Sequence, residues 1–270
     1  MKQRLEIRMF AHSWVSDWNH GNAHFLRGLA RELLRLGHGV RCYEELGSWS
    51  LSNLVRQEGE VAIGAIDQFR RTFPELDIQF YRRGSGLREV MKHELRSADL
   101  VLIHEWNEPS VVSTILDLKR QLGFRALFHD THHRAYTSPR DILRFDLHLF
   151  DGVLAFGEAM RRIYANGFGV PQVWTFHEGA DVSSFHPVAR PREIDILWIG
   201  NWGDAACFFR HNNAHSLTAT VMRLHSDRRL QRKYANSAYE HARARFSADR
   251  MVDEYLTLYG TLVTAEAAAA

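Results

Sequence analysis

The sequence predicts an α/β protein, with a parallel sheet covered by helices and a mostly helical C-terminal part. Up to about residue 185, short apolar runs alternate with longer amphipathic stretches, which is the pattern of strands joined by crossover helices. Each run is short and rich in residues that suit a strand buried on both faces. Beyond residue 200 the apolar residues have helical spacing instead.

The first helix is expected within Gly21–Gly37. There Phe25, Leu29 and Leu33 recur at helical spacing and form one apolar face, and Gly37 supplies a left-handed stop. Seven strands are expected in the first part of the chain: Leu5–Phe10, Val40–Tyr43, Leu76–Phe80, Leu100–Ile103, Ala126–Phe128, Gly152–Ala155 and Gln172–Thr175.

A linker is expected at Val188–Arg192, because this stretch contains Pro191 and little that is apolar. We therefore predict two domains, residues 1–187 and residues 192–264. The strand Asp195–Ile199 opens the second domain, and helices follow it to the end of the chain.

The predicted second domain has few strands. Asp227 is placed to cap one helix, and Met251, Tyr255, Leu258 and Leu262 give the last helix an apolar face. One strand with three helices cannot build the usual sheet of about five or six strands. The sequence therefore predicts a truncated C-terminal domain.

Composition and charge exclude several classes of protein. Hydrophobic residues make up 45% of the 270, which excludes disorder as the main state. The 34 Lys and Arg nearly balance the 32 Asp and Glu, so no nucleic-acid partner is expected. No segment is long and apolar enough for a signal peptide or a membrane span, and Cys42 and Cys207 are too few for a disulfide framework. A cytoplasmic protein without an integral membrane segment is expected.

One candidate site is the turn that leads into the first helix, where Gly21 and Asn22 stand. A glycine lets the backbone approach a ligand closely, and a helix N-terminus offers unpaired N–H groups to a phosphate. The alternative is ordinary turn geometry, because the turn lacks the full G-x-G-x-x-G pattern.

Imidazole and carboxylate groups are concentrated in a second candidate, His129–His133, which reads H-D-T-H-H directly after an expected strand. This composition suits either a divalent metal or a general acid/base site. It matches no zinc signature, and loop histidines at a polar crevice often only hydrogen-bond a substrate. Five histidines elsewhere lack paired spacing and are expected at the surface: His38, His93, His148, His225 and His241.

Two further polar pairs, His104–Glu105 and His177–Glu178, also follow expected strands. Ligands of open parallel sheets bind outside the carboxyl ends of the strands, so these groups are expected to converge in space. For either pair alone, the alternative is a helix cap or a tightened turn.

Four segments of the sequence, taken in chain order, form a recognisable series. Gly21–Val40 has a glycine-opened turn and a helix that ends in G-H-x-V, and His177–Asp181 reads H-E-G-A-D before Phe185. Asp195–Gly200 is an expected strand, and Ser247–Leu262 reads S-A-D-R-M-V-D-E-Y-L-T-L-Y-G-T-L. In this order they resemble segments of group 1 glycosyltransferases of the two-Rossmann (GT-B) architecture. The resemblance covers nearly all of residues 1–264.

The resemblance implies a Rossmann-like N-terminal domain and transfer of a sugar from a nucleotide-sugar donor to a saccharide or other acceptor. It implies no metal cofactor, because protein donors and helix dipoles offset the charge of the leaving diphosphate. A long donor-binding stretch is expected to be missing between Gly203 and Cys207. The site residues implied are His129 as the catalytic candidate, Gly21 and Asn22 facing the diphosphate or acceptor, and Glu105, Asp130 and Glu178 binding hydroxyl groups.

Three functions therefore stay open. The first is a glycosyltransferase, active if a partner chain or a homodimer replaces the lost donor site. The second is an inactive remnant that binds a saccharide or a protein. The third is a histidine-dependent metallohydrolase.

Overall fold

The computed structural model describes residues 4–16, 21–181, 184–185 and 214–267. Two compact units make up the chain: Met1–Val182 with Phe246–Ala270, and Ser183–Arg245. Within the described residues, no helix has both the length and the apolarity that a membrane span requires.

The first unit is built on a seven-stranded sheet in the order β3-β2-β1-β4-β5-β6-β7, in which every neighbouring pair is parallel. The predicted α/β class with a parallel sheet is confirmed. All seven expected strands form, with ends that differ by a residue or two, as is usual for element boundaries. They are β1 (Glu6–Phe10), β2 (Gly39–Glu45), β3 (Ile78–Tyr81), β4 (Leu100–His104), β5 (Arg125–Asp130), β6 (Gly152–Ala155) and β7 (Val173–Thr175).

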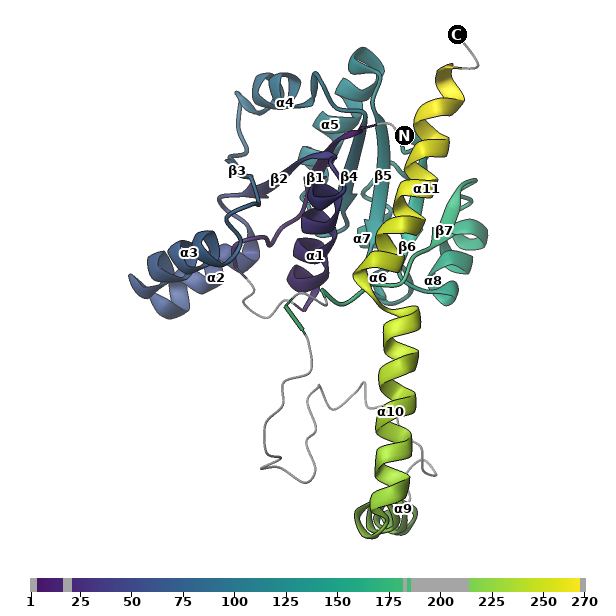
Figure 1. Ribbon diagram of the computed structural model, residues 1–270. Helices are drawn as coiled ribbons and strands as arrows, with labels where there is room; N and C mark the ends of the chain where they lie inside the picture. The colour runs from purple at the N-terminus through teal and green to yellow at the C-terminus, as the bar shows by residue number, and fades with distance from the viewer. Residues whose placement is uncertain (1–3, 17–20, 182–183, 186–213, 268–270) are drawn as a thin grey trace. The chain divides into compact units, whose positions relative to one another are not determined.

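Helices cover both faces of this sheet (Figure 1). One apolar cluster joins a face of the sheet to α1 and α11, and the other joins the opposite face to α4 and α5. The helices of this unit are α1 (Asn22–Arg35), α2 (Trp49–Glu58), α3 (Val61–Thr72), α4 (Leu87–Leu95), α5 (Pro109–Leu122), α6 (Arg134–Thr137), α7 (Pro139–Ile142), α8 (Glu158–Arg162) and α11 (Ala248–Ala267), with a 3₁₀ turn at Leu147–Leu149 and a π turn at Ile163–Gly167.

The end of α1 confirms the expected glycine stop. Gly37 has a φ of +88°, and its N–H donates to Leu34 O while the N–H of His38 donates to Leu33 O. This pair of bonds is a Schellman motif, which satisfies the last carbonyl groups of the helix. The expectation for His38 is wrong. Its side chain is buried, and its Nδ1 accepts a hydrogen bond from Leu5 N at 3.1 Å.

The last helix, α11, belongs to the sheet unit. Met251 and Tyr255 are buried on the sheet, and Leu258 and Leu262 pack against the same cluster. The sequence analysis placed this helix in the second domain. The spacing of its apolar residues shows that one side is buried, but it does not identify the element against which that side packs. The expected boundary at 187–192 and the strand Asp195–Ile199 lie outside the described residues, so the two predicted domains stay a prediction.

The second unit contains α9 (Ala214–Ser226) and α10 (Arg228–Arg245). Asp227 caps α10 as expected, since its Oδ1 accepts a hydrogen bond from Leu230 N at 2.8 Å.

Candidate functional site

The strand order places a topological switch point between β1 and β4. The chain leaves β1 toward β2 on one side of this point and leaves β4 toward β5 on the other. Ligands of open α/β sheets bind at the carboxyl ends of the strands beside such a point. His12, which follows β1, and His104, at the end of β4, meet there with their ring centroids 5.3 Å apart.

Four titratable side chains form a buried polar layer at this edge of the sheet: His104, Glu105, His129 and Asp130. Each is at most 1% exposed. Thr131 ties the layer together, because its Oγ1 lies 2.9 Å from His104 Nε2 and its N–H donates to Glu105 Oε1 at 3.1 Å. The ends of β4 and β5 are thus joined by side chains as well as by the sheet.

The buried carboxyl groups of Glu105 and Asp130 influence each other's pKa. Burial, and after it the charge of Asp130, raises the pKa of Glu105; burial also raises the pKa of Asp130. Glu105 Oε2 and Asp130 Oδ2 lack a hydrogen-bond partner of ordinary geometry in the described part of the chain. Arg134 lies beside Glu105, with its Nη1 3.9 Å from Oε2. Burial and mutual repulsion therefore favour the protonated form of these carboxyl groups.

His129 is enclosed by side chains from three elements. Its Nε2 lies 3.0 Å from the Tyr255 hydroxyl of α11, and its ring meets the edges of Phe25 and His104. Burial lowers the pKa of His129 to about 3, so the ring is neutral over the physiological range. A neutral imidazole here hydrogen-bonds and orients rather than carrying charge.

Glu178 follows β7 and lies near the same layer. Burial, and after it the charge of Asp130, raises its pKa to about 7. The next residues hold α11 in place: Gly179 N–H donates to Met251 Sδ, and Ala180 N–H donates to Phe246 O at 2.8 Å. The structure therefore brings Glu105, His129, Asp130 and Glu178 to one edge of the sheet, as the sequence predicted.

Gly21 and Asn22 open α1. Gly21 is the N-cap, and the first turn contains no acidic residue and no side-chain cap. A Cβ built on Gly21 meets no atom within 4 Å, so packing in the described chain does not require glycine there. The side chain of Asn22 lies outside the described set, and its role stays a prediction.

Glu44 and Arg27 shape the loop between β1 and α1, and sequence reasoning missed both. Glu44 Oε2 accepts hydrogen bonds from the N–H groups of Trp14 and Val15 at 2.8 and 2.9 Å, while Arg27 Nε donates to Trp14 O at 2.9 Å. Burial raises the pKa of Glu44 to about 7. The available signal was the acidic side chain of Glu44 near the end of β2, because a buried carboxylate requires donors.

Aromatic side chains stand above the buried layer. Trp106 is 39% exposed, and the guanidinium of Arg134 lies 4.2 Å from its ring centroid. The rings of His132 and His133 stack at 3.9 Å. These residues give the edge a planar, polar rim.

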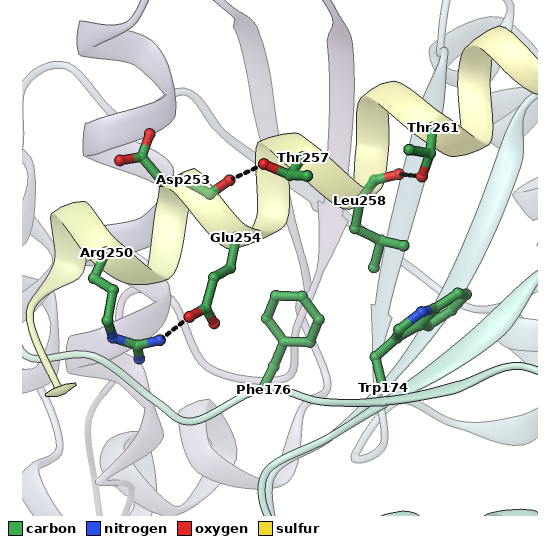
Figure 2. Close-up of a pocket in the computed structure, with 8 residues that line it drawn as sticks. All are labelled: Trp174, Phe176, Arg250, Asp253, Glu254, Thr257, Leu258 and Thr261. Carbon is green, nitrogen blue, oxygen red and sulfur yellow. Dashed lines mark hydrogen bonds and ion pairs between the residues drawn. The ribbon is translucent and has the colours of Figure 1, made fainter.

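A separate groove of about 740 Å³ lies between β7 and α11 (Figure 2). Trp174 and Phe176 line one side, and the Arg250–Glu254 ion pair and Leu258 line the helix side. Phe176 of the groove contacts the candidate site, because its ring packs 4.5 Å from that of Tyr255.

No metal centre is found among the residues that the structure describes, since none of their His, Cys, Asp and Glu side chains gather in a group of three that could hold an ion. The H-D-T-H-H segment disperses its groups: His129 faces α1 and α11, while Asp130 faces Glu105.

Comparison with known proteins gives neither a matching family model nor a matching curated protein. Among solved structures, the chain is similar to an alpha-glucosyltransferase in complex with UDP-glucose and DNA containing an abasic site, with 11% identity, a TM-score of 0.45 and coverage of 67% of this chain and 44% of that one. An alpha-glucosyltransferase with UDP and a 13-mer DNA containing a HMU base gives 11% identity, a TM-score of 0.42 and the same coverage.

The chain spans less than half the length of these solved structures. They contradict one expectation from the sequence. We expected no nucleic-acid partner from the near balance of charges, whereas these glucosyltransferases are bound to DNA. That expectation is withdrawn, because overall charge balance does not report how basic residues are distributed over a surface.

Proposed function

We propose that the chain is the acceptor-side part of a glycosyltransferase that uses a nucleotide-sugar donor. The observation that carries the proposal is the buried polar layer at the carboxyl ends of β4 and β5, with Glu178 beside it. Buried carboxyl groups with perturbed pKa values, beside a switch point, are typical of a functional site. The four sequence segments that resemble group 1 glycosyltransferases support the same function.

In this proposal the carboxyl groups of Glu105, Asp130 and Glu178 accept hydrogen bonds from sugar hydroxyls. A carboxylate suits this task because it offers several acceptor sites to the two or three adjacent hydroxyls of a sugar ring. His129 contacts the sugar or acceptor as a neutral group. The N–H groups at the start of α1 face the donor diphosphate, whose charge the helix dipole favours, so no metal cofactor is proposed.

Transfer by this chain needs a donor site from elsewhere. The sequence lacks the basic residues and the E-x7-E element that the family resemblance implies, so we propose that a partner chain or a second copy supplies them. Without it, the chain binds saccharide and does not transfer sugar, which is the second candidate function. A location in the cytoplasm is proposed from composition. The metallohydrolase alternative gains no support from the described residues.

A thermal-shift panel tests the proposal, with saccharides, divalent metals and nucleotide sugars that include UDP-glucose. We expect a nucleotide sugar or a saccharide to raise the melting temperature of the wild-type protein, because a ligand that binds only the folded state stabilises it. The effect should disappear in Glu178→Gln and persist in Glu158→Gln, since Glu158 is exposed on α8. Stabilisation by metals alone would contradict the proposal.

Gly21→Ala gives a second test of the same site. The added Cβ meets no described atom, so the unliganded fold should be unchanged. If the backbone at this turn approaches a diphosphate, the methyl group should weaken nucleotide-sugar binding while saccharide binding stays constant. Equal nucleotide-sugar affinity in both proteins would exclude this placement.

A further inference from the structure

The terminal helix reaches the buried polar layer through one side chain. Tyr255 is 1% exposed, and its hydroxyl lies 3.0 Å from Nε2 of His129, a residue 126 positions earlier in the chain. The ring of Tyr255 is fixed by contacts with Phe176 at 4.5 Å and with Tyr259 at 5.4 Å. Figure 1 shows α11 running beside α1 over the sheet. The hydroxyl is therefore held in place by the packing of the helix.

Relative acid and base strength decides which partner is the donor. In the described chain, the Tyr255 hydroxyl has one hydrogen-bond partner, His129 Nε2, and His129 Nδ1 has none. A phenolic hydroxyl is a stronger acid than the N–H of a neutral imidazole, and an imidazole nitrogen is a stronger base than a phenolic oxygen. The arrangement in which the hydroxyl donates to Nε2 is therefore favoured, and it leaves the proton of the ring on Nδ1.

We propose that Tyr255 is a positioning residue: its hydroxyl donates to Nε2 and holds His129 as the Nδ1–H tautomer, so that the imidazole offers an N–H to an oxygen of the bound substrate. An orphaned buried N–H is rare in native proteins, and a sugar or phosphoryl oxygen is the acceptor that completes it. The ligand part of this inference rests on the proposed function, whereas the tautomer is a property of the unliganded chain. Since burial keeps the ring neutral, one tautomer can persist across the physiological pH range.

The chain offers a matched control for the hydroxyl of Tyr255. Tyr259 lies one turn further along α11, is equally buried, and has a hydroxyl without a partner in the described residues. Tyr255→Phe and Tyr259→Phe each remove one buried oxygen and keep the ring. Only the first removes a partner of His129.

Long-range ¹H–¹⁵N NMR of the full chain reads the tautomer directly, with the His129 signals identified by their loss in His129→Gln. We expect wild-type His129 to show a protonated Nδ1 and an unprotonated Nε2. Tyr255→Phe should shift the signals toward a mixture with the Nε2–H form, and Tyr259→Phe should leave them unchanged. An Nε2–H tautomer in the wild type, or equal spectra for wild type and Tyr255→Phe, would overturn the proposal.

Titration with saccharides and with UDP-glucose then tests the ligand part. We expect the Nδ1–H signal to move on binding and the dissociation constant to rise about 3- to 10-fold in Tyr255→Phe, with no change in Tyr259→Phe. A response to saccharides alone identifies a sugar oxygen as the acceptor, and a response only to the nucleotide sugar identifies the donor. If His129 is the Nδ1–H tautomer but no ligand shifts the Nδ1–H signal, the ligand part and the proposed function fail. The positioning role of Tyr255 then stands.

Discussion

Replacing Gly179 with alanine should push the start of α11 away from the segment that follows β7. A Cβ on Gly179 would lie 2.9 Å from the carbonyl oxygen and 3.1 Å from the carbonyl carbon of Ser247. Both are backbone atoms, so neither can rotate away as the end of a side chain does. Gly179 has no positive φ. The expected effect therefore comes from this contact and not from backbone strain.

Two contributions set the size of the effect. Forcing extra volume into a packed site costs about 1–3 kcal/mol. Displacement also weakens the bridge between Ala180 and Ser247, with its backbone hydrogen bonds of 2.8 and 3.1 Å, each of which contributes about 1 kcal/mol. We expect the free energy of unfolding to fall by about 2–4 kcal/mol, which corresponds to a melting temperature lower by about 6–12 °C.

Urea unfolding measures this loss, and Gly260→Ala is the matched control. Gly260 lies inside α11, and a Cβ there meets no atom within 4 Å. Alanine should therefore stabilise the helix by about 1 kcal/mol, because glycine is a poor helix former. The two glycine variants should shift the urea midpoint in opposite directions. A Gly179→Ala midpoint equal to that of the wild type would refute the reasoning.

Three further predictions follow from buried polar groups. The raised pKa of Glu178 means that the folded state keeps a proton which the unfolded chain releases, so the stability of the fold falls as pH rises toward and through about 7. Urea midpoints should therefore fall between pH 5 and 8. Glu178→Gln should remove up to about 3 kcal/mol of that fall in the free energy of unfolding. Glu44→Ala leaves two buried loop N–H groups without their acceptor and should cost about 2–4 kcal/mol in urea unfolding, with a smaller loss in Glu44→Gln. Asp227→Ala removes the cap of α10 and should cost about 1 kcal/mol, seen as earlier melting of helix by circular dichroism. A flat pH profile, a silent Glu44→Ala or an unchanged α10 melt would each contradict the corresponding contact.

The sheet could be predicted from the sequence because its signals are local. A short apolar run such as Leu100–Ile103 shows its buried state without reference to the rest of the chain, and Gly37 marks the end of α1 by its own conformational freedom. The last helix shows the limit of such signals. The spacing of its apolar residues predicts that one side of this helix is buried. Because both faces of the sheet need a similar helical cover, the sequence cannot say that the helix packs beside α1.

The candidate site was predictable in position and not in detail. Residues that follow parallel strands meet at one edge, which is why Glu105, His129 and Asp130 were expected to converge. Their nearly complete burial and the contact between His129 and Tyr255 depend on side chains that are distant in sequence. Since local patterning carries no record of such contacts, only the structure could supply them.

Chemical-shift mapping with a saccharide and with a nucleotide sugar, each titrated separately, tests the central claim most directly. On titration into the ¹⁵N-labelled chain, we predict that the largest amide shifts fall at Gly21, Glu105, Asp130–Thr131 and Glu178, around the carboxyl ends of the strands. Shifts confined to the groove of Figure 2, or no shifts at saturating concentration, would contradict the account.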